Sequence, residues 1–156
     1  MPPQPLRFFE NICTEVIQKG LGYTVLARHA GVPVAGAVFF HGSNKAIYKF
    51  AASDEQFKHL QANNLVLWKA IEFYAKKGFS SMDFGRTSLS NSGLRRFKLA
   101  WNTRERPISY VRFENKTNAF VTTRDQASGS WFTELYKLLP PSLGRFVGAA
   151  LYKHLA

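Results

Sequence analysis

Three short β-rich runs, separated only by turn residues, constrain the fold of this chain more than any other feature. The runs cover residues 23–29, 34–40 and 46–51. Gly31 and Pro33 interrupt the sequence between the first two runs, and Gly42-Ser43-Asn44 interrupts it between the last two. Connections this short join antiparallel neighbours. The sequence therefore predicts an antiparallel meander of three strands.

Helical patterns lie on both sides of the meander. Residues 8–19 predict a first helix that ends at Gly20. After a loop over residues 53–62, apolar side chains recur at helical spacing at Leu67, Ala70, Ile71, Tyr74 and Ala75. Asn63 or Asn64 is expected to cap this second helix at its N-terminus.

Further strand and helix patterns follow. Residues 81–84 predict a short strand, Ser90 or Asn91 is expected to cap a helix that runs to Trp101, and residues 107–113 predict another strand. A meander followed by alternating helices and strands is typical of an α/β (α+β) fold with a sheet of mixed direction.

The rest of the chain is predicted to be a linker and a helical tail. Residues 1–113 are expected to form one lobe, 114–130 a polar linker, and 131–156 two amphipathic helices separated by Pro140-Pro141. The last helix has an apolar stripe at Leu143, Phe146, Val147, Leu151 and Tyr152. We expect this stripe to dock on its own domain, with contact to a membrane surface or a dimer partner as the alternative.

The charge of the chain predicts an anionic partner. Its 21 basic and 10 acidic residues give a net charge of +11. Residues 86–112 hold seven basic side chains and one acid, Glu105. Charge of this sign and clustering favours tRNA, a nucleotide-linked precursor or an acidic membrane surface.

Cysteine content and the N-terminus bear on location. The single cysteine, Cys13, excludes an intrachain disulfide, and we expect it to be a small buried residue of the first helix. The opening residues lack a signal-peptide pattern, and no apolar run reaches bilayer-spanning length. We therefore expect a cytoplasmic protein. Peripheral contact with the inner face of the membrane is compatible with this location.

Several chemistries lack their sequence patterns. The four histidines show no metal-ligand spacing, so no metal site is expected. The sequence contains no Gly-x-Ser-x-Gly nucleophile elbow, no Walker loop and no dinucleotide fingerprint. These absences argue against a metalloenzyme, a serine hydrolase of the elbow type and a nucleotide-dependent phosphotransferase.

Polar residues gather after the predicted strand 81–84. Asp83 and Arg86 lie at its carboxyl end, where α/β sheets place ligands. Arg95 and Lys98 are three residues apart and share a helix face. For Asp83 the alternatives are a general base and an ion pair with Arg86 or Arg95 that shapes the loop. For Lys98 the alternatives are a catalytic cation and a solvated surface charge.

Several ordered motifs resemble the second GNAT-like lobe of Fem-type (FemABX) proteins. Those motifs are the strings 48–54, 63–71, 83–87 and 93–98, together with Trp101. The segment from Leu138 to Leu155 resembles the tail of the FemAB-like branch linked with exopolysaccharide systems. The resemblance covers roughly residues 5–156 and implies an acyltransferase fold.

The resemblance also implies an activity. Fem proteins move an aminoacyl group from aminoacyl-tRNA to an amine of a peptidoglycan precursor, so acyl transfer to a cell-envelope precursor is expected. Phe97 and Lys98 match the Phe-Lys pair at the family's reacting centre, where an ammonium stabilises an oxyanion. The expected donor or substrate ligands are Tyr48, Asn63, Asn64, Arg86, Thr87 and Arg95.

Two alternatives stay open. The first is an acetyl-CoA-dependent GNAT N-acetyltransferase, although the loop over residues 56–62 lacks the glycines that usually cradle the coenzyme A pyrophosphate. The second is a non-catalytic binding module. Fem proteins normally carry two lobes and this chain holds one, so a second GNAT-like lobe or a homodimer is the expected protein partner.

Overall fold

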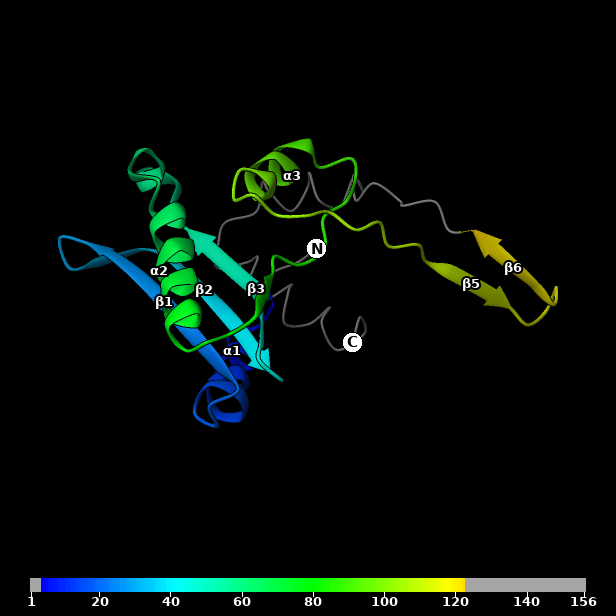
Figure 1. The fold of residues 1–156 in the computed structure, drawn as a ribbon, viewed down its shortest axis with the longest axis horizontal. Coiled ribbons are helices and arrows are strands. Elements are labelled where there is room, and N and C mark those ends of the chain that lie inside the picture. Colours follow the sequence, from blue (N-terminus) through cyan, green and yellow to red (C-terminus); the bar gives the residue numbers. More distant parts are fainter. Residues whose placement is uncertain (1–3, 123–156) are drawn as a thin grey trace. The chain divides into compact units, whose positions relative to one another are not determined.

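The computed structural model describes residues 4–122 of the chain (Figure 1). Its contacts separate the chain into a unit formed by Leu6–Gly85 and a second unit that continues from Arg86. Each unit is described by itself. The predicted tail over residues 131–156, with its apolar stripe, lies outside the described residues.

A mixed four-stranded sheet forms the centre of the Leu6–Gly85 unit, in the order β1-β2-β3-β4. The strands are β1 (Gly22–His29), β2 (Val32–Gly42), β3 (Lys45–Ser53) and β4 (Ser81–Asp83). The first three are antiparallel neighbours, and β4 pairs with β3 in parallel. The predicted meander and the mixed direction of the sheet are therefore confirmed.

Helices cover both faces of this sheet (Figure 1). The helix α1 (Leu6–Ile12) continues into a π-helical segment, η1 (Cys13–Ile17). The rings of Phe8 and Phe9 pack edge-on against Phe50 of β3. Cys13 is exposed, contrary to expectation, because this helix buries Ile12 instead.

The long helix α2 (Ala62–Lys76) packs on the opposite face. Its buried residues are Val66, Leu67, Ala70 and Tyr74. Phe39 of β2 is fully buried beneath it, and Tyr23 of β1 stacks on Phe73 with ring centroids 3.8 Å apart. The predicted apolar face is largely confirmed, but it is rotated slightly toward Val66, which leaves Ala75 exposed.

One polar link ties three elements of the core together. The Nε2–H of His41 donates to the carbonyl of Gly20 at 2.9 Å. In the tautomer that this bond requires, Nδ1 accepts from the hydroxyl of Tyr74, also at 2.9 Å. The end of the first helix, β2 and α2 are thereby joined through a single imidazole.

Burial of Tyr74 makes the stability of this core depend on alkaline pH. Burial raises the pKa of the Tyr74 hydroxyl from 10.0 to about 12. The unfolded chain therefore loses this proton first, so the contribution is complete below pH 10 and is lost as pH rises toward 12. We expect the unfolding free energy of the parent to fall more steeply over this range than that of Tyr74→Phe. Urea titrations of both proteins at several pH values measure the two slopes, and equal slopes would contradict the assignment.

The second unit contains a short helix and a hairpin. The helix is α3 (Ser92–Leu99), and the strands β5 (Val111–Glu114) and β6 (Ala119–Thr122) form the hairpin. The expected strand over 107–113 is shorter than predicted and begins only at Val111. The expected linker over 114–130 is wrong at its start, because residues 115–118 turn the chain into β6.

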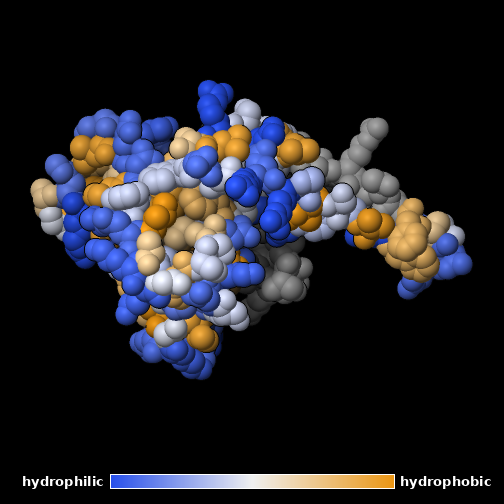
Figure 2. All heavy atoms as spheres, in the orientation of Figure 1, coloured by the Kyte–Doolittle hydropathy of each residue, from blue (hydrophilic) through white to orange (hydrophobic). Residues whose placement is uncertain are grey.

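The hairpin exposes one apolar face (Figure 2). Register places Phe113 opposite Phe120, and their ring centroids lie 5.1 Å apart. Val111, on the same face, is 66% exposed and Phe120 is 74% exposed. None of the helices within residues 4–122 is long and apolar enough to cross a bilayer.

Candidate active site

The strands β3 and β4 pair over only a short stretch and then separate. Their pairing runs from Lys45 with Ser81 to Ile47 with Asp83. From there β3 continues to Ser53 without β4, while its other edge stays paired with β2. After Asp83 the chain turns at Gly85, whose φ of +72° favours glycine. Beyond this point the outer edge of β3 has no strand partner among the described residues.

The hydrogen-bond alternation shows which groups this edge presents. The backbone N–H of Asp54 donates to the carbonyl of Val34 on β2 at 2.9 Å. In an antiparallel ladder, successive residues direct their backbone groups to opposite sides. Ala52 therefore faces β2, while Ala51 and Ser53 direct their N–H and C=O groups to the open side. The edge can pair with an extended ligand that carries amide groups.

The open edge ends at the start of α2. The Asn63 amide donates to the Ser53 hydroxyl at 3.0 Å, which joins the helix start to the strand end. Asn63 and Asn64 were expected as capping residues, but the N-cap is Gln61, with φ of +49°. The expected loop over residues 53–62 is wrong because Glu55–Leu60 form a 3₁₀-helix, η2. Only Gln61 remains between η2 and α2.

Tyr48 lines the point where the strands separate. Its ring stacks on Phe39 with centroids 5.2 Å apart and meets Phe84 edge-on at 6.1 Å. Burial raises the pKa of the Tyr48 hydroxyl. A Cβ atom placed on Gly85 would lie 3.3 Å from the Tyr48 carbonyl oxygen, so the two backbones run close together here.

The carboxylate of Asp83 shapes the turn that follows β4. Its Oδ1 atom accepts a hydrogen bond from the Gly85 N–H at 2.6 Å. This contact is local, and it differs from the expected pairing with Arg86 or Arg95. The described partner of Arg86 is the hydroxyl of Tyr110, and the described partner of Arg95 is Glu105.

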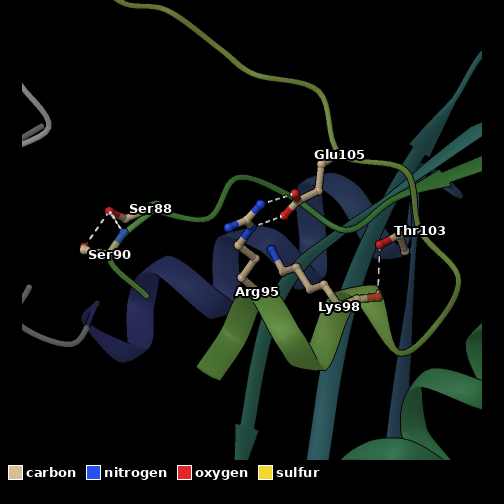
Figure 3. Close-up of polar contacts among 6 residues, drawn as sticks. All are labelled: Ser88, Ser90, Arg95, Lys98, Thr103 and Glu105. Atoms are coloured by element: carbon tan, nitrogen blue, oxygen red, sulfur yellow. Dashed lines mark hydrogen bonds and ion pairs between the residues drawn. The ribbon is translucent and has the colours of Figure 1, made fainter. Parts of the chain in front are cut away.

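In the second unit, α3 carries the cationic candidates (Figure 3). Asn91 caps α3 by accepting from the Leu94 N–H at 3.0 Å, as predicted. Arg95 donates to both oxygens of Glu105, at 2.6 and 2.7 Å. The hydrogen bond from Arg95 lowers the pKa of Glu105. This two-point contact fixes the segment after α3 to the helix.

Two hydrogen bonds position Lys98, and Figure 3 shows the one with Thr103. Its ammonium donates to the Arg86 carbonyl at 3.3 Å, and its own carbonyl accepts from the Thr103 hydroxyl at 3.0 Å. Lys98 and its neighbour Phe97 are partly exposed. The side chain thus lies over the start of the segment that follows Gly85 in sequence.

Three hydroxyl side chains lie in the segment between Gly85 and α3, those of Thr87, Ser88 and Ser90. The side chains of Ser88 and Ser90 hydrogen-bond to each other at 2.8 Å (Figure 3). The Thr87 hydroxyl oxygen is buried, and within residues 4–122 it has no hydrogen-bond partner. A ligand oxygen or nitrogen is one group that could satisfy it.

The structure places the predicted ligands in two sets. Tyr48, Asn63, Asn64 and Asp83 belong to the Leu6–Gly85 unit. Arg86, Thr87, Arg95, Phe97 and Lys98 belong to the unit that continues from Arg86. Within residues 4–122, no group of three or more metal-binding side chains occurs.

The candidate site also contains residues that the sequence analysis did not identify as site residues. Thr103 and Glu105 hold α3 through contacts five and ten residues along the chain. Ala51 has no reactive side chain and enters the site only through its backbone. A search for charged motifs cannot find such a residue. The sequence signal for it is that the predicted strand containing Ala51 is longer than the predicted strand that begins at Ser81.

Comparison with known proteins bears on the family and fold of the chain. The family profile described as acetyltransferase (GNAT) domain matches residues 1–99. The aminoglycoside N-acetyltransferase AAC(6')-Iy, solved with CoA, superposes with a TM-score of 0.54 at 18% identity, over 67% of this chain and 86% of its own. No curated protein matches the sequence.

Two other solved acetyltransferases superpose similarly. An aminoglycoside acetyltransferase from an uncultured soil metagenomic sample, in complex with sisomicin, gives a TM-score of 0.53 at 14% identity, over 62% of this chain and 68% of its own. The ribosomal-protein-alanine N-acetyltransferase of Brucella melitensis gives 0.53 at 10% identity, over 72% of this chain and 83% of its own. At these identities the likeness establishes a shared fold.

Proposed function

Because the chain belongs to the family of GNAT acetyltransferase domains, we propose that it is an N-acyltransferase that uses acetyl-CoA as its acyl donor. The observation that carries this proposal is the open edge of β3, which continues to Ser53 after its last pair with β4. An edge of this kind binds an extended ligand through its backbone, as a strand would.

The donor fits the groups along this edge. Ala51 and Ser53 offer outward N–H and C=O groups to the amides of an extended pantetheine arm. The N-terminus of α2 follows directly, and helix N-termini attract phosphate groups. The bound donor would supply an acyl group already activated as a thioester. The glycine-free η2 places Lys58 and His59, rather than a glycine-rich turn, before this helix.

Two residues of α3 are assigned to the transfer itself. An amine that attacks the thioester carbon forms a C–N bond and places negative charge on the acyl oxygen, and a fixed ammonium stabilises that charge. The C–S bond then breaks, and coenzyme A leaves as a thiol with the proton that the amine gives up. We assign this role to Lys98, whose position is set by Arg86 and Thr103. The carbonyl of Phe97 would orient the attacking amine.

The second candidate function is Fem-type aminoacyl transfer to a cell-envelope precursor. The specific observation in its favour is that η2, a helix without glycine, occupies the place where a glycine-rich pyrophosphate turn would lie. A net charge of +11 suits tRNA as well as coenzyme A. Acetyl-CoA binding separates the two candidates, because an aminoacyl-tRNA enzyme has no need of it.

Replacing Ala51 with proline tests the donor site through a single backbone group. Proline removes the outward N–H of Ala51, and proline is tolerated where a strand edge faces solvent. Loss of one hydrogen bond and of close approach should weaken acetyl-CoA binding about tenfold. Isothermal titration of the parent and Ala51→Pro measures the change.

The matched control is Ala51→Ser, which keeps the backbone N–H and alters an exposed side chain. We expect it to bind acetyl-CoA like the parent. If the proline variant binds as tightly as the serine variant, the donor does not lie on this edge. If the parent binds no acetyl-CoA, the proposed donor is wrong and aminoacyl transfer becomes the leading function.

A further inference from the structure

Positive charge is divided unevenly between the two units. Residues 86–122 hold eight basic and two acidic side chains, a net charge of +6, whereas residues 6–85 hold nine and six, a net charge of +3. The type of cation also differs, because six of the eight basic residues in 86–122 are arginines, against two of the nine in 6–85. Arginine presents a planar fork that fits carboxylate and phosphate groups in two-point contacts. The unit that continues from Arg86 is therefore suited to a large anionic partner.

Four exposed cations of this stretch, which we call the cationic group, are Arg104, Arg106, Arg112 and Lys116. The two acids of residues 86–122 are engaged elsewhere. Glu105 accepts both hydrogen bonds from Arg95, and Glu114 accepts from the Thr117 hydroxyl at 2.8 Å. Within residues 4–122, none of the four cations forms an ion pair. The cationic group is thus available to an outside anion.

The segment before α2 bears on how the phosphates of a donor are held. In η2, the N–H groups of Gln56 and Phe57 donate to the side chain and the carbonyl of Asp54, at 3.0 and 3.1 Å. The N–H of Gln61 bonds back into η2, also at 3.0 Å. Coenzyme A joins its pantetheine arm to a nucleotide through a pyrophosphate. The backbone N–H groups that would cradle such a pyrophosphate are used inside this segment.

We propose that the acyl donor reaches this chain on an acidic carrier protein, as a thioester of that protein's phosphopantetheine arm. The inference rests on the proposed N-acyl transfer and names what carries the acyl group. The arm has the amides of coenzyme A, so it would pair with the open edge of β3 in the same way. One phosphate joins it to its carrier, without a pyrophosphate, which suits a segment whose N–H groups are occupied. The carrier's carboxylates would then meet the cationic group.

The transfer step keeps its balance with this donor. The amine nitrogen forms the new C–N bond, the C–S bond breaks, and the thiol that takes the amine's proton stays on the carrier's arm. Binding has two linked parts, since an arm held at the β3 edge raises the effective concentration of the carrier at the cationic group. RNA also offers anions to arginine, but it has no extended arm with amide groups for the edge. The carrier protein accounts for both features.

Isothermal titration of the full chain with three ligands tests the proposal. The ligands are acetyl-CoA, an acidic acyl carrier protein charged with acetyl-phosphopantetheine, and the same carrier without its arm. We expect the parent to bind the acetyl-carrier about tenfold more tightly than acetyl-CoA. Arg106→Glu/Arg112→Glu should weaken both carrier forms about tenfold and leave acetyl-CoA within about twofold. Ala51→Pro should weaken acetyl-CoA and the acetyl-carrier and leave the armless carrier unchanged.

The matched control is Lys76→Glu/Lys77→Glu, which changes the net charge equally at the exposed end of α2. It should bind all three ligands like the parent. Binding of acetyl-CoA without tighter binding of the acetyl-carrier, or equal effects of the two charge reversals, would overturn the carrier and leave the proposed transfer intact. Failure of both thioesters to bind would instead contradict the proposed function. Tighter binding of a tRNA-sized RNA than of the acetyl-carrier would assign the cationic group to RNA and overturn the proposal.

Discussion

Replacing Phe39 with alanine is expected to lower the free energy of unfolding by about 3–5 kcal/mol. Phe39 is fully buried at the centre of β2, between the sheet and α2. Its ring centroid lies 5.2 Å from that of Tyr48 and 6.0 Å from that of Tyr74. Truncation would remove these contacts and leave a cavity beneath α2, which close-packed surroundings fill only in part.

Urea denaturation followed by circular dichroism measures this effect. The matched control is Phe120→Ala, which truncates the same type of side chain on the hairpin, where Phe120 is 74% exposed. We expect a small change there. A loss of less than about 1 kcal/mol in Phe39→Ala would show that the core does not centre on β2 and α2.

Replacing Lys98 with methionine is expected to reduce turnover about 100- to 1000-fold, with a much smaller effect on donor binding. Methionine keeps much of the length and apolar stem of the side chain and removes its charge. In the structure that charge lies 3.3 Å from the Arg86 carbonyl oxygen. The stabilised charge develops mainly in the transition state, so kcat should fall while the donor dissociation constant changes little.

Arg96→Met is the control for this experiment. Arg96 is an exposed cation of the same helix, two residues before Lys98. A general loss of positive charge would slow both variants equally, whereas a specific role would slow Lys98→Met alone. Turnover of Lys98→Met within a few-fold of the parent would identify Lys98 as a surface lysine.

Local patterns predicted most of the Leu6–Gly85 fold. Turn residues such as Gly31 and the triplet 42–44 fix short connections, and short connections allow few alternatives to an antiparallel meander. The face of α2 followed from periodicity in the same way. The prediction was wrong where the sequence pattern was short. The helix η2 spans only Glu55–Leu60, and Gln61, which directly follows it, is the N-cap of α2 in place of Asn63.

The hairpin of β5 and β6 was missed although a signal was present. Val111 and Phe113 alternate with polar residues, Asn115 and Asn118 mark a turn, and Phe120 follows. Strands of four residues give too little alternation to separate them from a polar linker. Length rather than composition therefore limited the prediction here.

The candidate site was only partly visible in the sequence. The strings around Asp83 and Lys98 stood out because charged residues follow a strand. The pairing of Arg95 with Glu105 depends on how a loop returns to α3, which no periodicity encodes. The open edge depends on where β4 stops, and its ligand groups belong to the backbone of residues such as Ala51.

Hydrogen–deuterium exchange with and without saturating acetyl-CoA tests the central claim most directly, because it reports on the backbone N–H groups of the open edge. The account predicts slower exchange in peptides that cover residues 49–63, at the edge of β3 and the start of α2. It predicts no change in the exchange rate of residues 22–29 in β1, which forms the opposite edge of the sheet. Unchanged exchange over 49–63 at saturating acetyl-CoA, or protection confined to another part of the chain, would contradict it.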